Sequence, residues 1–199
     1  KGTASHSSMP NFGYNALDPV ISILAAVNEE FRAAEIPVNT ILGNVTVNTD
    51  ILAGGVQVNS LPESAEAQIN IRTIPEFNGK DVLNKFDAIV KKELQKSNQN
   101  YDVNMAKMLP IELKQADISY EVMMDEPAVI STKENYLIHL AQTIGEKYAG
   151  EKIPVLASPG ITDASNLMRD QDDNVPFIVF GPGNTTSHTA NEYVDQKMY

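Results

Sequence analysis

The sequence predicts an α+β domain with two helices against one antiparallel sheet, followed by part of an α/β domain. Up to about residue 110, segments with strand-like and helix-like hydrophobic periods follow the order β-α-β-β-α-β. Further on, two short apolar runs, residues 153–157 and 176–180, flank a helical segment. That pattern is typical of parallel strands joined by a crossover helix. We expect the first domain to cover residues 1–112 and the second residues 113–199.

The first domain opens with a short β-compatible segment, residues 3–8. Asn15 is expected to cap a helix that runs to about Ala33. Five apolar side chains give this helix one stripe at helical spacing: Leu17, Val20, Ile21, Leu24 and Phe31. A strand at Thr40–Asp50 follows, and Gly54-Gly55 is expected to turn the chain into the next strand.

Residues 64–73 alternate between apolar and polar side chains, which predicts a half-buried strand. Asn78-Gly79 predicts a turn, and an amphipathic helix is expected from there to about Ser97. Residues 101–109 are predicted to form another strand. This order of elements predicts a ferredoxin-like βαββαβ fold, with both helices on one face of an antiparallel sheet.

The second domain is expected to begin with a helix at Lys133–Ala149, ended by Gly150 as its C-cap glycine. A buried strand at residues 153–157, a short helix at Thr162–Arg169 and a buried strand at residues 176–180 follow. Two parallel strands cannot bury both of their faces alone. We therefore expect the other strands of this sheet to come from outside the given sequence.

Composition narrows the classes of function. The 199 residues carry a net charge of -11, from 26 acidic and 15 basic side chains, which disfavours nucleic acid and anionic membranes as partners. No apolar run approaches the roughly 18 residues of a membrane span. The sequence has no cysteine, which excludes disulfides and thiolate metal sites and favours a cytoplasmic protein.

His188 is the first candidate for a metal ligand. It follows the predicted strand at residues 176–180 and the turn at Gly181-Pro182-Gly183, and ligands bind at this edge of open α/β sheets. Imidazole is a common zinc ligand, but zinc requires about four ligands and no motif in the sequence supplies the others. An ordinary loop histidine remains the alternative.

His6 lies in a serine-rich loop before the first long helix. It is either a hydrogen-bonded loop histidine or a donor that stabilises a developing oxyanion. A nucleophilic pair with Ser5, Ser7 or Ser8 is less favoured because no Gly-x-Ser-x-Gly motif is present. The third histidine, His139, lies off the apolar stripe of its helix and is expected to be solvated.

Four further residues are candidates for binding a substrate carboxylate. Arg72, on the polar side of its strand, is either solvated or a bidentate clamp. Asn59 either forms a turn or donates to the same ligand. Gly160 and Thr162 belong to the loop before the short second-domain helix, where Thr162 or Asp163 caps the helix or backbone N–H groups bind the carboxylate.

Taken together, four regions resemble the M20 family of zinc-dependent amidohydrolases, in the order that family shows. The matching segments are Gly2–Ala16, Asn59 with Ile71-Arg72, Gly160–Ala164, and Phe180-Gly181-Pro182 with Ser187–Glu192. Within the family, they look most like succinyl-diaminopimelate desuccinylases and acetylornithine deacetylases. The resemblance implies a homodimer that associates through the first, lid domain and acts on a small N-acyl amino acid.

The resemblance also implies roles for these residues. In such enzymes two zinc ions, or cobalt, activate a water that attacks an amide carbonyl. His188 would be a metal ligand, and His6 would reach the other subunit's active site and hold the oxyanion. Asn59, Arg72, Gly160 and Thr162 would hold the substrate's carboxylates.

The sequence departs from the family pattern in one large respect. The His-x-Asp, bridging Asp and Glu-Glu segments, which precede the lid in the family, are not in this sequence. We therefore expect a fragment of the parent enzyme that is inactive alone. Dipeptidase or aminoacylase activity is an alternative within the enzyme class. A non-catalytic dimerisation or ligand-binding module is the alternative outside it.

Overall fold

The structure is a computed structural model that describes residues 1–102, 116–131, 135–158, 160–169, 171, 175–184 and 186–196. It divides into two compact units, Lys1–Asp125 and Glu126–Tyr199, and each is considered by itself. The expected boundary at residue 112 lies outside the described residues and stays a prediction. Among the helices that the structure describes, none combines the length and apolar character needed to cross a membrane.

Two helices form one layer of the first unit. Helix α1 covers Leu17–Glu30 with Ala16 as its N-cap residue, and the side chain predicted as the cap, Asn15, accepts a hydrogen bond from the Leu17 amide at 3.0 Å from one residue further back. Helix α2 covers Gly79–Asp102 and starts at the Asn78 side chain, which accepts from the Lys80 amide at 2.9 Å. These side chains satisfy amides that the first helical turn leaves without partners.

Helix α2 is longer than its hydrophobic stripe predicts. It ends at Asp102 rather than near Ser97, so the prediction of a strand from residue 101 is wrong at its first two residues. The remainder of that predicted strand, residues 103–109, lies outside the described residues. The stretch after Ser97 is polar, and polar residues such as Gln and Asn can extend a helix without adding to its apolar stripe.

Two antiparallel strands form the main sheet. Strand β3 covers Thr46–Gly54 and strand β4 covers Ala65–Arg72, with Thr46 opposite Arg72 at one end and Gly54 opposite Ala65 at the other. The register shifts by one residue between Thr49 and Ile51, as a β-bulge does. Burial alternates along β4, which confirms the strand predicted at residues 64–73.

The strand predicted at Thr40–Asp50 begins later than expected. A small hairpin comes first, with β1 at Val38–Asn39 and β2 at Gly43–Asn44. The Asn39 side chain accepts from the amides of Ile41 and Leu42 at 2.9 and 2.8 Å. These hydrogen bonds from nearby backbone amides to an asparagine side chain stabilise a turn, so the chain reverses before it can continue as a strand.

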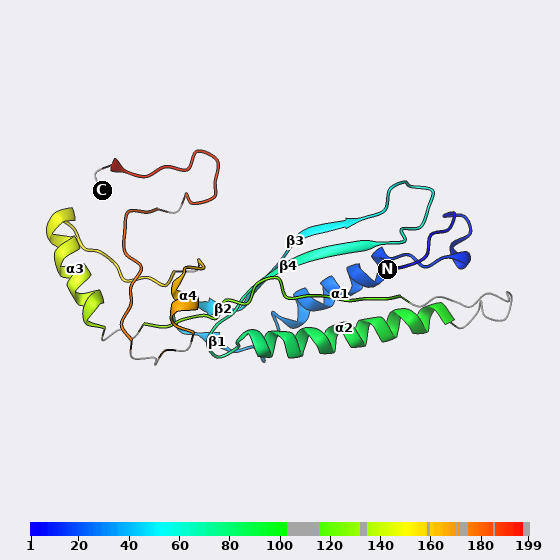
Figure 1. Ribbon diagram of the computed structural model, residues 1–199, viewed down its shortest axis with the longest axis horizontal. Helices are drawn as coiled ribbons and strands as arrows, with labels where there is room; N and C mark the ends of the chain where they lie inside the picture. The colour runs from blue at the N-terminus through cyan, green and yellow to red at the C-terminus, as the bar shows by residue number, and fades with distance from the viewer. Residues whose placement is uncertain are drawn as a thin grey trace. The chain divides into compact units, whose positions relative to one another are not determined.

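The core of the first unit lies between the helices and the β3–β4 ribbon, and Figure 1 shows α1 and α2 side by side with it. The fully packed side chains come from both helices, β3 and the connecting loops: Ile23, Val27, Phe31, Ile36, Val45, Val47, Ile74, Val82, Ile89 and Val90. The unit is therefore a mixed α/β domain in which both helices share one apolar layer with the ribbon.

The four-stranded sheet of the predicted ferredoxin-like fold is not seen among the described residues. The expected strand at residues 3–8 makes only isolated bridges, Thr3 with Tyr14 and His6 with Ser60. Its residues are small and polar, and Pro10–Phe12 turn immediately afterwards as a short 3₁₀ helix. A segment that offers so little apolar area does not form a continuous ladder.

The second unit contains helix α3, Tyr136–Ala149, and the short helix α4, Ala164–Leu167. The Asn135 side chain accepts from the Leu137 amide at 2.8 Å and caps α3 at its start. Gly150, with a φ of 73°, ends it in the left-handed conformation that glycine favours. Both ends of α3 therefore lie close to the predicted positions.

The two strands predicted in the second unit are wrong within the described residues, and so is the expected βαβ sheet. Residues 153–157 and 176–180 are assigned to no strand. Side chains of the α3 region bond to their carbonyl groups instead. Gln142 Nε2 donates to the Ile153 carbonyl at 2.9 Å, and Asn135 Nδ2 donates to the Phe177 carbonyl at 3.1 Å. An apolar run needs neighbouring strands before its backbone can join a ladder.

Helix α3 buries none of its residues. Four large apolar side chains, spaced four residues apart, remain about half or more exposed: Tyr136, Leu140, Ile144 and Tyr148. Three of them, Leu140, Ile144 and Tyr148, belong to the apolar stripe that the sequence predicts for this helix, and the described part of the unit does not cover them.

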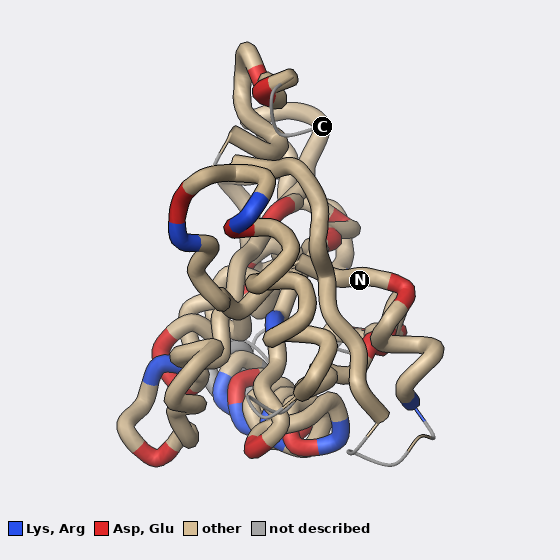
Figure 2. The backbone as a smooth tube through the Cα atoms, turned by 90° about the vertical axis from the view of Figure 1, so that its left-hand side faces the viewer, with Lys and Arg blue, Asp and Glu red and all other residues tan. Residues whose placement is uncertain are grey.

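Charged side chains pair locally in the helix layer. Lys92 Nζ lies 2.9 Å from a Glu30 carboxylate oxygen, and Lys85 Nζ lies 3.5 Å from the other. Figure 2 shows acidic and basic positions interspersed along the backbone. The charges of the two first-unit helices thus partly neutralise one another through pairs between α1 and α2.

Candidate functional site

The loop between β3 and β4 is tied to the N-terminal loop by backbone hydrogen bonds. The Ser7 amide donates to the Asn59 carbonyl at 3.0 Å, and the Leu61 amide donates to the Ser5 carbonyl at 2.8 Å. These two bonds run in antiparallel register. They bring two of the candidate residues, His6 and Asn59, into adjacent loops although they are far apart in sequence.

Two glycines allow this arrangement. Gly55 has a φ of 78°, a conformation that favours glycine, and a Cβ there would lie 3.3 Å from the Pro62 side chain. Gly13 packs so closely that a Cβ would lie 2.5 Å from the Thr3 carbonyl oxygen. The loops are therefore held by close backbone packing and not by the hydrogen bonds alone. We call the residues 5–8 and 55–61 together the paired loops.

The side chain of His6 is held at one ring nitrogen. Its Nδ1 lies 2.7 Å from Ser8 Oγ and accepts a hydrogen bond from the Ser8 amide at 3.2 Å. The rest of the His6 side chain is exposed to solvent. The site thus presents an oriented imidazole.

The neighbouring part of the paired loops is exposed as well. Asn59 is exposed, and Val56 and Val58 have relative exposures of 98% and 102%. Residues 2–16 and 54–63 contain no lysine or arginine, and Glu63 is their one charged side chain. The end of the ribbon near His6 is therefore a surface without basic side chains, made of polar groups, apolar side chains and one carboxylate.

Arg72 does not join this group within one copy of the chain. It lies opposite Thr46, at the far end of the β3–β4 ribbon from the paired loops, as Figure 1 shows. At a rise of ~3.4 Å per residue, the length of β4 separates the two ends by about 24 Å. Within one unit, a small molecule in contact with His6 and Asn59 is too short to reach Arg72.

Gly160 and Thr162 lie in the second unit, before α4. Thr162 Oγ1 accepts from the Ala164 amide at 3.3 Å, and the Thr162 carbonyl accepts from the Ser165 amide at 3.0 Å. Asp163 makes no side-chain cap bond, so Thr162 is the capping residue of the two proposed from the sequence. Gly160 is exposed, and the space at its Cβ position is open apart from Ser158 Oγ at 3.7 Å.

His188 lies in a loop that closes on itself. Its amide donates to Glu192 Oε2 at 3.1 Å, and its φ of 61° is unusual for a residue other than glycine. Asn184 Nδ2 donates to the Tyr193 carbonyl at 2.7 Å and joins the two ends of the loop. The loop thus holds the His188 backbone in a defined conformation and leaves the side chain exposed.

The described residues do not by themselves form a zinc site. Within them, no three histidine, cysteine, aspartate or glutamate side chains gather as metal ligands would. His188 offers one imidazole. The side-chain carboxylate of Glu192 already accepts a hydrogen bond from the His188 backbone amide. Zinc sites require three or four protein ligands, so this donor set is incomplete and we derive no chemical step through a metal.

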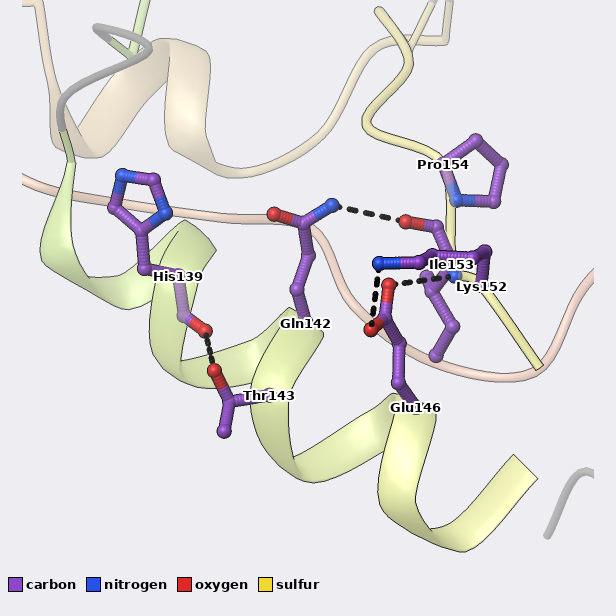
Figure 3. A pocket seen from close by; sticks show the side chains of 7 residues that line it. All are labelled: His139, Gln142, Thr143, Glu146, Lys152, Ile153 and Pro154. Atoms are coloured by element: carbon purple, nitrogen blue, oxygen red, sulfur yellow. Dashed lines mark hydrogen bonds and ion pairs between the residues drawn. The ribbon is translucent and has the colours of Figure 1, made fainter. Parts of the chain in front are cut away.

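A hollow on the surface of the second unit contains none of the candidate residues. Figure 3 shows it along one face of α3, where Glu146 accepts from the Ile153 amide at 3.2 Å and pairs with Lys152 at 3.7 Å. Its lining residues are His139, Gln142, Thr143, Glu146, Lys152, Ile153 and Pro154. His139 is exposed there, as the sequence predicts.

The carboxyl groups with shifted pKa values are structural. Hydrogen bonds from Lys96 and Ser22 lower the pKa of Glu93, and the hydrogen bond from Lys92 lowers that of Glu30. These groups join α1 to α2 or stabilise α2. They lie in the helix layer and therefore do not indicate a catalytic acid or base.

The contact of Ser8 with His6 was not predicted from the sequence, which suggested Ser8 only as a nucleophile. In the structure the amide and hydroxyl of Ser8 both lie at the His6 ring. The usable signal was the spacing: a side-chain acceptor commonly bonds the amide two residues later in a turn.

Comparison with known families identifies the first unit. Residues 1–98 match the family described as the peptidase dimerisation domain, M20_dimer. These residues belong to the M20 peptidase dimerisation domain family. The paired loops, α1, the β3–β4 ribbon and all but the last turn of α2 fall within the matched residues.

Two curated relatives match the whole chain. It is 27% identical over 223 residues to a probable succinyl-diaminopimelate desuccinylase of Staphylococcus epidermidis and 28% identical over 225 residues to one of Staphylococcus aureus. Each alignment covers 100% of this chain and 50% of the relative. The chain thus spans about half the length of the curated relatives it matches.

Two solved structures share the fold. The aminopeptidase PepT from Bacillus cereus has a TM-score of 0.53 at 17% identity, over 88% of this chain and 39% of that protein. A tripeptidase from Staphylococcus aureus has a TM-score of 0.55 at 15% identity, over 84% and 38%. At such low identity these likenesses concern the fold alone.

Proposed function

We propose that this chain contributes to a metal-dependent amidohydrolase that removes an N-acyl group from an amino acid, with N-succinyl-diaminopimelate as the favoured substrate. Residues 1–112 would be the lid, of ferredoxin-like topology, and residues 113–199 part of the catalytic domain. The match of the whole chain to probable desuccinylases supports the substrate. The dimerisation domain supports the enzyme family.

The observation that carries the proposal is the bridge between His6 and Ser60, which places His6 and Asn59 in adjacent loops at one end of the β3–β4 ribbon, with Arg72 at the other end. If the side chains of His6, Asn59 and Arg72 serve one active site, they must come from different copies of the chain. A two-fold dimer provides this, because each copy gives its paired loops to the partner and receives the partner's in return.

The edge of β3 supports association through the dimerisation domain. In the described part of the chain β3 pairs only with β4, so its other edge has no ladder partner. Ile51 and Leu52 on this strand are nearly half exposed. A long, unpaired strand with exposed apolar side chains is a surface that a second strand can cover.

Each candidate residue then has a role set by its chemistry. Neutral His6 would donate a hydrogen bond to the oxyanion that forms when the amide carbonyl is attacked. Asn59 would donate its amide group to the substrate, and Arg72 would bind a substrate carboxylate. The backbone at Gly160 and Thr162 would hold a second carboxylate.

His188 would supply one ligand of a zinc site, or of a cobalt site, whose other ligands belong to the rest of the enzyme. The exposed side chain on a fixed backbone supports this role. When bound, the metal would supply an activated water for amide hydrolysis. His188→Ala should remove bound metal from the full-length protein, as measured by metal analysis, whereas His139→Ala should leave it in place.

Mixed dimers test the shared site. The variants His6→Ala and His188→Ala of the full-length protein should each be inactive with N-succinyl-diaminopimelate. After the two are unfolded together in equal amounts and refolded, the mixture should recover about a quarter of the wild-type activity, because half of the dimers are then mixed and each mixed dimer carries one intact site of two. No recovery, in dimers shown by mass spectrometry to be mixed, would place His6 and His188 in the same subunit's site.

The same assay separates the alternatives within the enzyme class. Faster hydrolysis of N-acetylornithine or of a dipeptide would assign the protein to a deacetylase or a dipeptidase. Hydrolysis of none of these, with a stable dimer, would favour a non-catalytic dimerisation or ligand-binding module.

A further inference from the structure

The turn that follows His6 determines how its ring is held. The Met9 amide donates to the His6 carbonyl at 2.8 Å, which closes a four-residue turn. Ser5 Oγ donates to the Met9 carbonyl at 3.2 Å and secures the same turn from its other side. Ser8 occupies the third position of the turn, so its amide and hydroxyl both lie near the His6 side chain.

His6 uses this turn in the way that asparagine uses an Asx-turn. In an Asx-turn, the side-chain oxygen of one residue accepts from the amide two residues later. Here His6 Nδ1 is the acceptor and the Ser8 amide, at 3.2 Å, is the donor. The Ser8 hydroxyl, 2.7 Å from the same nitrogen, adds a second contact.

The direction of the amide bond decides which ring nitrogen carries the proton. A backbone N–H donates and cannot accept, so Nδ1 must be the unprotonated nitrogen when this bond forms. A neutral imidazole has one proton, which then lies on Nε2. Among the described residues, no hydrogen-bond partner is recorded for Nε2, and the side chain is exposed.

We infer that Ser8 is a positioning residue that holds neutral His6 as the Nε2–H tautomer, so that His6 presents a single outward N–H donor. This inference rests on the proposed function for its catalytic consequence. The opposite tautomer would expose a lone pair at Nε2, which would repel an oxyanion. Ser8 therefore acts through His6 and need not touch the substrate.

Ring nitrogen chemical shifts test the tautomer without any assay of activity. In ¹⁵N NMR of the full-length protein with labelled histidines, above the pH range where histidine titrates, the His6 signals are those that disappear in His6→Gln. We expect one pyridine-type nitrogen at Nδ1 and one pyrrole-type nitrogen at Nε2. An Nδ1–H pattern, or an even mixture of tautomers, would overturn the inference.

Variants at Ser8 test whether this residue holds the His6 tautomer. Ser8→Ala keeps the amide bond that fixes the tautomer but removes the hydroxyl contact, so the two ring shifts should move part of the way toward each other as the hold on the tautomer weakens. Ser8→Thr should restore the wild-type shifts, and Ser7→Ala is the matched control. Unchanged shifts in Ser8→Ala, with an unchanged circular dichroism spectrum, would overturn the part of the proposal that rests on the Ser8 hydroxyl.

Kinetics then separate this inference from the proposed function. With an active enzyme, Ser8→Ala should lower kcat about tenfold and change KM by less than twofold, because the contact acts when the oxyanion forms. An enzyme with no amidase activity that still shows the Nε2–H pattern would refute the proposed function and leave the tautomer assignment intact. An active enzyme with the Nδ1–H pattern would refute the tautomer assignment and leave the proposed function intact.

Discussion

Ser22 on α1 donates a hydrogen bond to the carboxylate of Glu93 on α2 at 2.6 Å and so joins the two helices of the dimerisation domain. Glu93 is only 5% exposed, and Lys96 Nζ lies 2.5 Å from its other carboxylate oxygen. Both oxygens of this buried carboxylate therefore have a donor. The hydrogen bonds from Lys96 and Ser22 lower the pKa of Glu93 below its ordinary value of 4.5.

This pair predicts how stability changes in acid. Because the pKa of Glu93 is lower in the folded state, its stabilising effect is present above pH 4.5 and is lost as the pH falls through the folded value. Glu93→Gln should flatten the fall in unfolding free energy below pH 5, measured by urea titration. Glu66→Gln, at an exposed position of β4, should keep the wild-type slope. Equal slopes for Glu93→Gln and wild type would contradict the prediction.

A second prediction concerns the close packing at Gly13. A Cβ at this position would lie 2.5 Å from the Thr3 carbonyl oxygen and 2.5 Å from Ser5 Oγ. Gly13→Ala should lower the unfolding free energy by about 1–3 kcal/mol, because the backbone must shift to relieve the contact. Gly181→Ala, where no atom lies within 4 Å of the added Cβ, is the control and should change little.

The turn at Asn39 predicts a third effect. Its side-chain oxygen accepts from Ile41 and Leu42, and its Nδ2 donates to the Glu76 carboxylate at 2.9 Å. Asn39→Ala removes these bonds and should reduce the unfolding free energy by about 1–2 kcal/mol in urea titration. Asn48→Ala, on the exposed side of β3, should stay within about 0.5 kcal/mol of wild type. A similar loss in both variants would argue against the turn as the cause.

Asn135 provides a prediction for the second unit, since it has two separable roles. Its oxygen caps α3, and its Nδ2 donates to the Phe177 carbonyl at 3.1 Å. Nδ2 also donates to Ser131 Oγ, so Asn135→Asp keeps the cap and removes both bonds donated by Nδ2, whereas Asn135→Ala removes all three. The alanine variant should be the less stable of the two by about 1 kcal/mol in thermal unfolding. An aspartate variant as unstable as the alanine variant would mean that the cap contributes little.

Helices and β4 were predictable because their signals are local. Asn15, Asn135 and Gly150 act within one turn of the helices they end, and the alternation along β4 is visible in eight consecutive residues. The late start of β3 was not predicted. The side chain of Asn39 binds backbone amides that could otherwise join a strand, and the hydrophobic pattern of the sequence carries no sign of these bonds.

The apolar runs of the second unit were wrongly predicted as strands because strand formation depends on distant segments. Residues 153–157 and 176–180 have the composition of buried strands, but a strand exists only with a partner to bond. Their carbonyl groups at Ile153 and Phe177 accept from Gln142 and Asn135 instead. Sequence pattern reports what a segment prefers and not whether its neighbours are present.

The candidate site was likewise predictable only in part. His6, Asn59 and Arg72 could be selected by residue type, but their grouping depends on contacts between distant segments. The bonds of Ser7 with Asn59 and of Leu61 with Ser5 place His6 near Asn59, and the length of β4 removes Arg72 from both. The roles of all six candidate residues stay predictions that the variants above can test.

The hydrogen bond between Ser7 and Asn59 has a consequence for the order of folding. It joins loops that are separated in sequence by α1, the β1–β2 hairpin and β3, so its formation carries the loop-closure entropy of that whole stretch. Local helices and the β3–β4 hairpin form on shorter timescales than such distant contacts. We therefore expect the placement of His6 beside the loop of Asn59 to be established among the last steps of folding, and a destabilised dimerisation domain to lose this placement before it loses its helices.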